Sequence, residues 1–356
     1  MQLQFDTDKT YAVALEGGGA KGAYEIGVWQ ALEEAGVQYN AVSGTSVGAL
    51  NGGLMVMRDL PRAIEAWKDI RLSKVIDLDE NEEDEMKRLM QGELEPEDLT
   101  ELIPQAFELI RNRGLDVAPL RAWVREVIDP KKIRASDVDF YISTVSLSDR
   151  KPLEIHVNEL PEEQICDMLL ASAYHPSFRL EKLGGKFYTD GGFFDTLPLH
   201  ALVENGYRDI IAVRIPGIGV ERRFKLPEDV NLTTIVPWAD LGHTLNFDAE
   251  QARRDMHIGY LDGMRMLYGL HGRKYYTERT MTEREALAWI LDRYGGMAET
   301  LRAVTERELP HMAKRLDAAD ADYYELMLLL CEEEAEKQGV EALRIYTDRE
   351  LLETLA

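Results

Sequence analysis

The chain has 356 residues, and 45% of them are hydrophobic, so it can bury a sizeable core without a disulfide scaffold. Its 65 acidic and 41 basic residues give a net charge of −24, which would repel a phosphate backbone, so no nucleic-acid partner is expected. The two cysteines, Cys166 and Cys331, lie far apart and outside any metal-ligand spacing, which argues against structural zinc and favours a reducing cytoplasm.

The N-terminus does not resemble a secretory leader. Met1 to Thr10 is mostly polar and has no apolar stretch of the kind that a signal peptide requires. The longest apolar run, Leu326 to Cys331, is too short to cross a bilayer. We therefore expect a soluble, cytoplasmic protein.

The first predicted unit is a strand, a glycine loop and a helix. Tyr11 to Leu15 is an apolar run that stops at three consecutive glycines, as a buried strand does when it ends in a tight turn. From Tyr24 onward, apolar residues recur at helical spacing, and Gly36 stands where a C-terminal cap is expected.

The same succession follows a second time. Ala41 to Ser43 has the composition of a strand end, Gly44 to Gly48 forms a sharp turn, and Ala49 to Met57 is a helix of small and apolar residues. Further predicted strands are Phe140–Val145, Glu154–Val157, Phe187–Thr189 and Ile210–Ile215, and further predicted helices are Pro119–Ile128 and Glu162–Ala173.

Between these elements lies an acidic segment. Residues 77–101 contain twelve acidic and two basic residues with little apolar periodicity, which is typical of a solvated surface insertion, and we place this insertion at about 77–114. Beyond about Asn246 the pattern becomes helical, with a capping box at Thr282 and Glu285 and a helix over Tyr323–Glu336.

Alternating strands and helices predict an α/β fold, a three-layer α/β/α sandwich with a mainly parallel sheet. The C-terminal part predicts a helical subdomain. We therefore divide the chain into a catalytic α/β domain over residues 1–245 and a helical C-terminal subdomain over residues 246–356.

Gly44-Thr45-Ser46-Val47-Gly48 stands between the second predicted strand and its helix. A Gly-x-Ser-x-Gly pentapeptide in this context is typical of a nucleophile elbow, in which a strained turn lifts the serine hydroxyl out of the backbone. Ser46 is thus the candidate nucleophile, and the N–H of Val47 is a candidate oxyanion donor.

The glycine loop Gly17 to Gly22 supports two interpretations. Exposed N–H groups at a helix start can bind a pyrophosphate or can stabilise the oxyanion of acyl transfer. A dinucleotide site requires an acidic residue at the end of the next strand, but Ser43 and Gly44 stand there. A Walker P-loop is excluded because Lys21 is followed by Gly22 and not by Ser or Thr.

A serine nucleophile also needs a base. One candidate is Asp190, which begins the glycine-rich turn Asp190-Gly191-Gly192; the others are histidines, and the order Ser46, Asp190, then His200 or His243 agrees with a hydrolase triad. His175 and His200 are the histidines that most need checking, although none has a recognisable catalytic spacing.

Together these three motifs resemble the patatin-like phospholipases, and in particular the bacterial lipid acyl hydrolases among them. Gly17 to Gly22 is similar to that family's oxyanion loop, with Gly17, Gly18 and Gly19 as implied donors, and Gly44 to Gly48 is similar to its elbow. Asp190-Gly191-Gly192 is similar to its aspartate motif. The resemblance extends more loosely from Tyr11 to Ile215.

The resemblance implies a Ser46–Asp190 dyad without histidine, no metal and no organic cofactor, and hydrolysis of the carboxylic esters of phospholipids or related acyl esters. It also implies a lipid substrate and transient contact with a membrane. A dyad requires that desolvation or a neighbouring charge raise the pKa of Asp190, because an ordinary carboxylate is too weak a base near neutral pH. The rivals are a nucleotide-binding module using Gly17 to Gly22 and an inactive scaffold with the same fold.

Three residue sets retain two interpretations each. Asp195, where relatives often carry Asn, would raise the pKa of Asp190 if the two carboxylates were close. Lys21 would contact a lipid phosphate or pair with Glu25 one helical turn on. A helical face formed by Met256, Tyr260, Met264 and Leu267 would be core or the wall of an acyl tunnel.

Overall fold

The computed structural model describes residues 1–77, 114–217, 219–294 and 301–355. The chain forms two compact units, one of Asp6–Gly263 and one of Met1–Phe5 with Met264–Ala356. We call them the α/β unit and the C-terminal unit. The expected acidic insertion at about 77–114 lies outside the described residues, apart from its two end positions.

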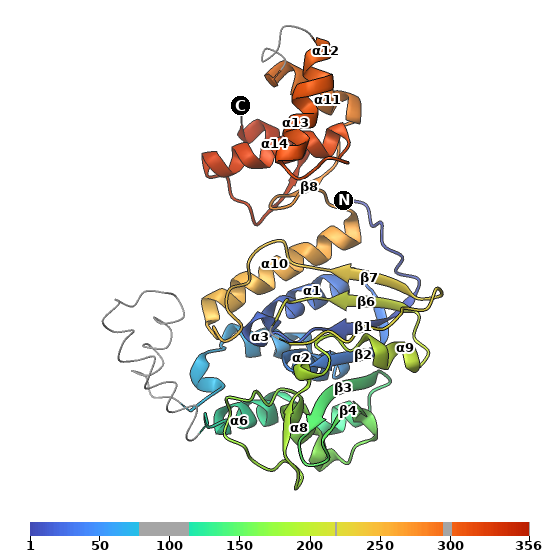
Figure 1. The fold of residues 1–356 in the computed structure, drawn as a ribbon, viewed down its shortest axis with the longest axis vertical. Helices are drawn as coiled ribbons and strands as arrows, with labels where there is room; N and C mark the ends of the chain where they lie inside the picture. The colour runs from blue at the N-terminus through green and yellow to red at the C-terminus, as the bar shows by residue number, and fades with distance from the viewer. Residues whose placement is uncertain (78–113, 218, 295–300, 356) are drawn as a thin grey trace, which may run out of the picture. The chain divides into compact units, whose positions relative to one another are not determined.

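The α/β unit is built on a seven-stranded sheet with the order β4-β3-β2-β1-β6-β7, to which β5 adds by pairing with β3 (Figure 1). Neighbouring strands pair in parallel except at β4 and β5, which are antiparallel to β3, so the sheet is mixed and mostly parallel. The strands are β1 Thr10–Leu15, β2 Gln38–Thr45, β3 Asp139–Ser146, β4 Lys151–His156, β5 Tyr188–Asp190, β6 Asp209–Val213 and β7 Asn231–Ile235.

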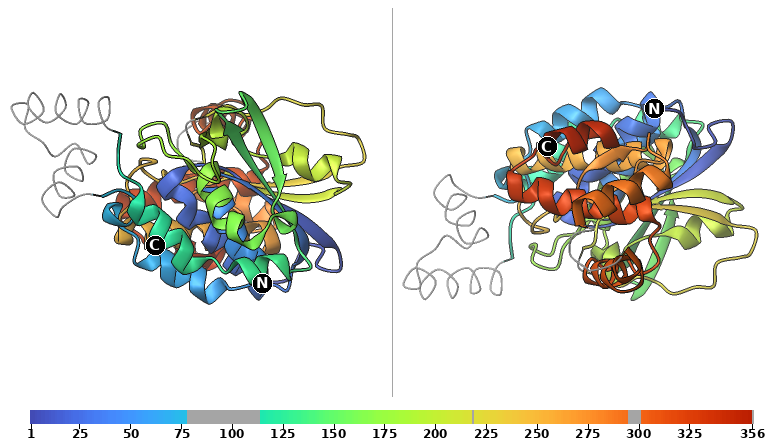
Figure 2. Two further views of the ribbon diagram at one scale, coloured as in Figure 1. Left: turned by 90° about the horizontal axis from the view of Figure 1, so that it is seen from below. Right: turned by 90° about the horizontal axis from the view of Figure 1, so that it is seen from above.

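Helices cover both faces of this sheet (Figure 2). On one face, side chains of β1, β2 and β6 form a buried cluster with Leu199 and Leu202 of α9. On the other face, α2 lies so close that a Cβ at Gly52 would be 2.7 Å from the ring of Phe140. The helices are α1 Ala23–Glu34, α2 Val47–Val56, α3 Leu60–Lys68, α6 Ala118–Val127, α7 Pro130–Arg134, α8 Glu162–Ser172, α9 Leu199–Glu204 and α10 Ala249–Tyr268.

The expected α/β fold with a mainly parallel sheet is confirmed; β4 and β5, antiparallel to β3, make the sheet mixed. The apolar runs expected as strands overlap β1 to β6, and the expected helices overlap α1, α2, α6 and α8. The expected strand Ile210–Ile215 is too long, because β6 ends at Val213. No pattern in the sequence predicted α3, α7, α9 or β7. β7 reads Asn-Leu-Thr-Thr-Ile and is mostly exposed, because it lies at the sheet edge and therefore lacks the continuous apolar run of an inner strand.

The C-terminal unit combines a two-stranded parallel sheet, β8 Tyr276–Glu278 and β9 Ile345–Thr347, with helices around one buried cluster. The capping box at the start of α11 is confirmed, since Glu285 N–H donates to Thr282 Oγ1 (3.3 Å) and Thr282 N–H donates to Glu285 Oε2 (2.8 Å). Its helices are α11 Glu283–Tyr294, α12 Leu301–Ala303, α13 Leu309–Arg315, α14 Tyr323–Gln338 and α15 Asp348–Thr354.

The two compact units divide after Gly263, inside α10, whereas the sequence suggests a domain division at 245/246. Compactness within one chain does not establish a domain that folds by itself, so the two-domain division stays a prediction. Among the described residues, no helix is both long enough and apolar enough to cross a bilayer.

Candidate active site

Ser46 occupies a strained turn between β2 and α2. Its φ of 56° and ψ of −125° lie outside the region that side-chain-bearing residues usually adopt, as expected for a nucleophile elbow. The flanking glycines leave no room for a side chain: a Cβ at Gly44 would lie 2.2 Å from the Gly48 carbonyl oxygen, and one at Gly48 would lie 2.5 Å from that of Leu15. The elbow is therefore tightly packed at both ends.

The backbone of the elbow is held by Ser172, a residue outside the three motifs. Ser172, at the end of α8, is fully buried; its Oγ accepts the Ser46 N–H (3.0 Å) and donates to the Ser143 carbonyl (2.6 Å). The hydroxyl thus ties the strained turn to β3. A buried small polar side chain at a helix end was the available signal, and it is too common to be specific.

Asp190 lies next to Ser46 because the strands that precede them, β5 and β2, both pair with β3. Thr45, the last residue of β2, pairs with Ser143 of β3, and Asp190 of β5 pairs with the next residue, Thr144. Ser46 Oγ donates a hydrogen bond to Asp190 Oδ2 at 2.7 Å, and Gly192 N–H donates to Oδ1 at 2.7 Å. The two motifs, 144 residues apart in the chain, form one direct contact.

Burial raises the pKa of Asp190 to about 6, although the hydrogen bonds from Ser46 and Gly192 lower it. The second carboxylate, Asp195, does not contribute to this shift, so of its two interpretations the one in which it raises the pKa of Asp190 is not supported. Asp195 is itself fully buried, and burial raises its own pKa to about 6. The base candidate is thus tuned by desolvation.

The glycine loop lies beside the same hydroxyl. Gly17, Gly18, Gly19 and Val47 line one cavity together with Ser46 and Asp190. Gly17 N–H donates to the Thr196 carbonyl at 2.9 Å, so this N–H group is already hydrogen-bonded and is not directed at an oxyanion as the sequence suggested. In the described part of the chain, no hydrogen bond takes up the N–H of Gly18, Gly19 or Val47.

Lys21 and Gly22 have structural contacts at the end of this loop. Lys21 Nζ donates to the Pro216 carbonyl at 2.7 Å rather than to Glu25, which is buried and accepts from Asn51 Nδ2 at 2.8 Å. A Cβ at Gly22 would lie 2.5 Å from Val47 Cγ2, so only glycine fits against α2. At Gly191 a Cβ would lie 2.2 Å from the Ser143 carbonyl oxygen.

The cavity has a volume of about 220 Å³, and its walls are mainly apolar. Its far wall comes from residues outside the three motifs, among them Trp67, Ile70, Leu120, Trp123 and Phe178. None of the described residues that line it belongs to α10, so Met256 and its helical neighbours do not wall an acyl tunnel there. A Cβ at Gly27 of α1 would lie 1.8 Å from the Met256 carbonyl oxygen, which places this part of α10 in the core.

No histidine stands between Ser46 and Asp190. His175 lines the cavity, but its Nδ1 contacts Ser177 Oγ (2.8 Å). His200 lies with Glu154 and Glu204, a grouping of possible metal ligands among the described residues. A guanidinium already fills this grouping, because Arg222 Nη1 lies 2.9 Å from Glu154 Oε1 and 3.2 Å from His200 Nδ1, which disfavours a cation there.

Comparison with known proteins connects this geometry to a family. A family model described as patatin-like phospholipase matches residues 13–203. Lysophospholipase NTE1 of Cryptococcus neoformans var. neoformans serotype D is 26% identical over 207 residues, covering 58% of this chain and 11% of that protein. Patatin-like phospholipase domain-containing protein 6 of Homo sapiens is 26% identical over 211 residues, covering 59% and 14%.

The matched region therefore spans 11% to 14% of the length of these two relatives. Among solved structures, VipD from Legionella pneumophila aligns over 97% of this chain and 85% of that chain, with a TM-score of 0.43 and 14% identity. That likeness is too distant to support a statement about function.

Replacing Asp190 by Asn tests the cost of burying its carboxylate. The folded pKa of about 6 exceeds the unfolded value near 3.8, so between these pH values the folded chain keeps a proton that the unfolded chain releases. This group therefore lowers the free energy of unfolding as pH rises, by about 3 kcal/mol at most once pH exceeds 7. Asp190→Asn is expected to stabilise the protein relative to wild type more at pH 8 than at pH 4 in urea unfolding.

Asp149→Asn is the matched control, since its carboxylate is exposed and hydrogen bonds from Lys186 and Ser146 lower its pKa. Its ionised form stabilises the fold above the unfolded pKa, so this variant should lose stability relative to wild type as pH rises. A stability difference for Asp190→Asn that does not change with pH would contradict the buried ionisation.

Proposed function

The match over residues 13–203 makes the chain a member of the patatin-like phospholipase family, and on that premise we propose that it is a serine lipid acyl hydrolase. Its substrates are the carboxylic esters of phospholipids or related acyl esters. The observation that carries this proposal is the direct hydrogen bond from Ser46 Oγ to Asp190 Oδ2 at a strained elbow. A hydroxyl that donates a hydrogen bond to a carboxylate of raised pKa is placed to transfer its proton to that carboxylate.

The reaction proceeds in two halves. Ser46 Oγ attacks the ester carbonyl carbon while Asp190 accepts the hydroxyl proton, and Asp190 then returns this proton to the leaving alcohol. A water molecule, deprotonated by Asp190, attacks the acyl-enzyme; the bond to Ser46 Oγ breaks, Asp190 returns the proton to Ser46 Oγ, and the carboxylic acid leaves. The same residues thus serve both halves, and no other side chain is needed as a base.

Negative charge on the carbonyl oxygen is stabilised by N–H groups of Gly18, Gly19 and Val47. These N–H groups lie at the cavity that contains Ser46, and in the described structure they have no other acceptor. Gly17 does not serve as a donor, because its N–H is held by Thr196. Each such donor is worth roughly 10²–10³ in rate in related chemistry.

The apolar cavity receives the acyl chain of the substrate. Aromatic and aliphatic walls favour a hydrocarbon over a charged ligand, which also weighs against a nucleotide at this loop. The relatives that match carry the names lysophospholipase and patatin-like phospholipase, which supports a lipid ester as substrate.

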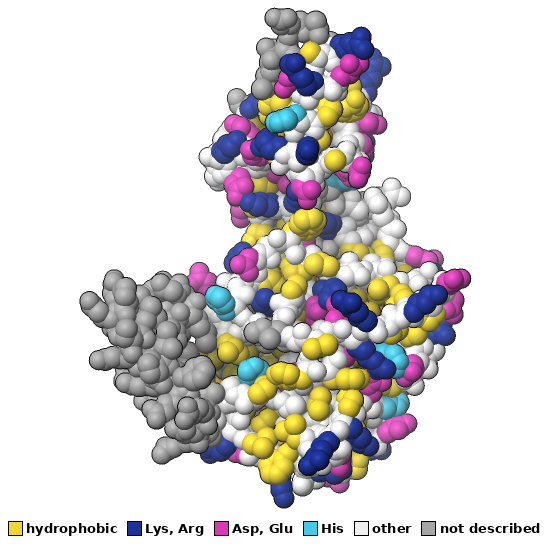
Figure 3. Space-filling view, in the orientation of Figure 1, with side chains coloured by type: hydrophobic (Ala, Val, Ile, Leu, Met, Phe, Trp, Pro, Cys, Tyr) yellow, Lys and Arg dark blue, Asp and Glu magenta, His cyan; other side chains and the backbone are white. Residues whose placement is uncertain are grey.

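The cavity mouth faces a lipid surface while the enzyme works. Phe193 and Leu245 line the cavity and are 54% and 41% exposed, and Val220, which is 55% exposed, donates its N–H to Gly192 next to Phe193. Figure 3 shows hydrophobic side chains gathered over the region of α2 and α8 on one face of the α/β unit. Exposed apolar side chains around an apolar cavity favour contact with a lipid aggregate.

The dyad is tested with Ser46→Ala and Asp190→Asn variants on a soluble short-chain nitrophenyl ester. Ser46→Ala removes the nucleophile and Asp190→Asn removes the base, and both groups take part in the transition state. We therefore expect kcat to fall by about 10³-fold or more. A fluorophosphonate probe should label wild type and Asp195→Asn but not Ser46→Ala.

Histidine variants supply the controls for the dyad. His175→Ala, His200→Ala and His243→Ala should keep most of the labelling by the probe, and a lethal effect at one of them would replace the dyad by a triad. An unlabelled wild-type chain would favour an inactive scaffold. Saturable binding of NAD, FAD or ATP in calorimetry, lost on loop substitution, would favour a nucleotide site.

The pH dependence of kcat/KM follows from the same carboxylate. Asp190 acts as a base only when ionised, and burial raises its pKa to about 6, so kcat/KM should rise with pH and level off above about pH 7. At pH 5 it should be about tenfold below the plateau. Asp195→Asn should keep this rise, although Asp195 also has a pKa of about 6. A profile that is flat down to pH 4.5 would refute the assignment of a buried base.

Contact with a lipid surface is tested by comparing monomeric and micellar forms of one ester. Val220→Ser removes an exposed apolar side chain at the mouth, so it should lower the rate on micelles severalfold and leave the rate on monomers nearly unchanged. Leu232→Ser is the control, because Leu232 is 37% exposed on the edge strand β7. Equal effects of the two variants on micelles would show that the mouth has no special affinity for lipid.

A further inference from the structure

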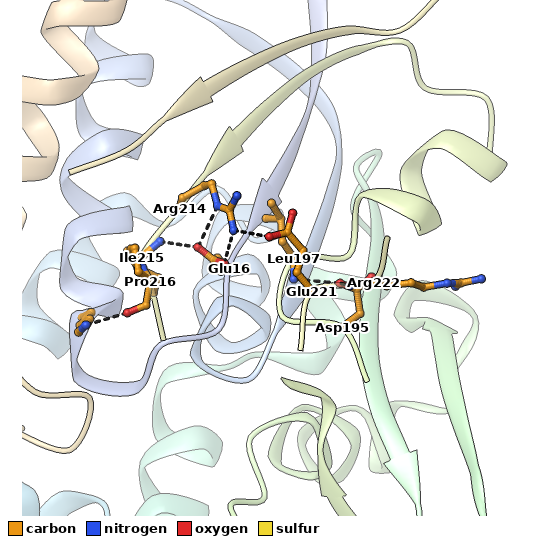
Figure 4. Close-up of polar contacts among 9 residues, drawn as sticks. Glu16, Asp195, Leu197, Arg214, Ile215, Pro216, Glu221 and Arg222 are labelled. Carbon is orange, nitrogen blue, oxygen red and sulfur yellow. Dashed lines mark hydrogen bonds and ion pairs between the residues drawn. The ribbon is translucent and has the colours of Figure 1, made fainter. Parts of the chain in front are cut away.

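The segment that follows β6 runs between the two loops that carry the candidate site. We call it the strap and define it as residues 214–217 and 219–222 (Figure 4). The strap contains none of the three motifs, and none of its residues was a candidate site residue in the sequence. Its contacts on each side identify what it holds.

On one side the strap touches the glycine loop through backbone atoms. Lys21 Nζ donates to the Pro216 carbonyl at 2.7 Å. A Cβ at Gly217 would lie 2.5 Å from the Gly17 carbonyl oxygen, and a Cβ at Gly18 would lie 2.7 Å from the Ile215 carbonyl oxygen. The position of the strap therefore limits where the loop that carries the N–H groups of Gly18 and Gly19 can lie.

On the other side the strap pairs with the aspartate loop. Val220 N–H donates to the Gly192 carbonyl at 2.8 Å, and Thr196 N–H donates to the Val220 carbonyl at 2.8 Å. Arg222 N–H also donates to Asp195 Oδ1 at 3.3 Å. Gly192 is the residue whose own N–H holds Asp190, so the strap connects the base loop with the glycine loop.

One ion pair fixes the start of the strap. Glu16, directly after β1, is 3% exposed; its carboxylate accepts from Arg214 Nη2 at 2.9 Å and from Ile215 N–H at 2.9 Å. Arg214 Nη2 also donates to Glu221 Oε2 at 2.7 Å, so the same guanidinium reaches the far end of the strap (Figure 4). One cation thus holds both ends.

The strands themselves do not need this ion pair. Leu15 of β1 pairs with Val213 of β6, and the N–H groups of Glu16 and Arg214 donate to the carbonyls of Val213 (3.2 Å) and Ile235 (2.9 Å), so backbone hydrogen bonds alone fix the strands up to these two residues. What the pair adds lies beyond the strand ends, where the glycine loop begins and the strap leaves. Its energetic contribution therefore falls on the two loops and not on the sheet.

We propose that Glu16 and Arg214 are positioning residues, whose ion pair seats the strap and thereby sets the glycine-loop N–H groups against Ser46 and Asp190. The inference rests on the proposed acyl-hydrolase function. Neither residue touches the substrate. Displacing an oriented group by about 1 Å can cost roughly 10²-fold in rate, so a loosened strap lowers the rate of the chemical step while the cavity still binds substrate.

The test is Arg214→Met, which removes the charge and keeps an unbranched stem. On the soluble nitrophenyl ester, kcat should fall about 10- to 100-fold with KM within about twofold, and the rate constant of fluorophosphonate labelling should fall in parallel. Arg214→Lys should recover part of both. The control is Arg208→Met, at the start of the same strand, where Arg208 Nε pairs with Asp229 at 2.6 Å; it should match wild type.

Gly217→Ala gives a second route if Arg214→Met does not fold. It leaves the ion pair and crowds the Gly17 carbonyl, so it should give the same loss of kcat with an unchanged KM. A wild-type protein without turnover or labelling refutes the proposed function itself. If wild type is active, two results for Arg214→Met overturn the positioning role. One is a kcat within twofold of wild type; the other is a smaller fraction of labelled molecules with an unchanged labelling rate constant.

Discussion

The structure of the site depends on the register of two strands along one edge of β3. β2 pairs with residues 139–143 of β3, and β5 pairs with residues 144–146, so the two strands lie end to end on the same edge. The residue that leaves β2 is Ser46, and the residue that ends β5 is Asp190. Because the side-chain pattern of a sheet alternates with every residue, a shift of one position would turn the carboxylate to the other face and separate the pair.

Burial gives the aspartate its basicity and also constrains the surroundings. Burial raises the pKa of Asp190, and Asp190 also lines the mainly apolar cavity, so the proposed base and the proposed site for an apolar ligand share one environment. A charged neighbour is not required, and Asp195 does not act as one. Asp195 instead links the loops: its carbonyl accepts from Thr45 Oγ1 at 2.8 Å, and its Oδ1 accepts from Leu197 and Arg222 N–H groups.

Much of the fold and the centre of the site can be read from the sequence, because local chemistry specifies them. Close backbone contacts leave room only for glycine at Gly44 and Gly48 around Ser46 and at Gly191 after Asp190, and these glycines make the motifs visible in the sequence. The cavity wall could not be predicted, since Trp67, Leu120 and Phe178 carry no motif and reach the cavity only through tertiary packing. The contacts of Ser172, Glu16 and Arg214 could not be predicted for the same reason, since Ser172 meets Ser46 at a separation of 126 residues and Glu16 meets Arg214 at a separation of 198.

The pairing of β5 with β3 has a bearing on how such a protein can diversify. β4 and β5 both end on β3, with His156 opposite Tyr141 and Tyr188 opposite Ser146, and the intervening chain supplies Ala173, His175 and Phe178 to the cavity. The ladder anchors this excursion at both ends, and within it Ser172 accepts the Ser46 N–H (3.0 Å) and the Tyr174 carbonyl accepts the Asp190 N–H (2.8 Å). A change in this excursion that spares Ser172 and Tyr174 would therefore alter the cavity wall and leave both backbone anchors of the hydroxyl–carboxylate pair in place.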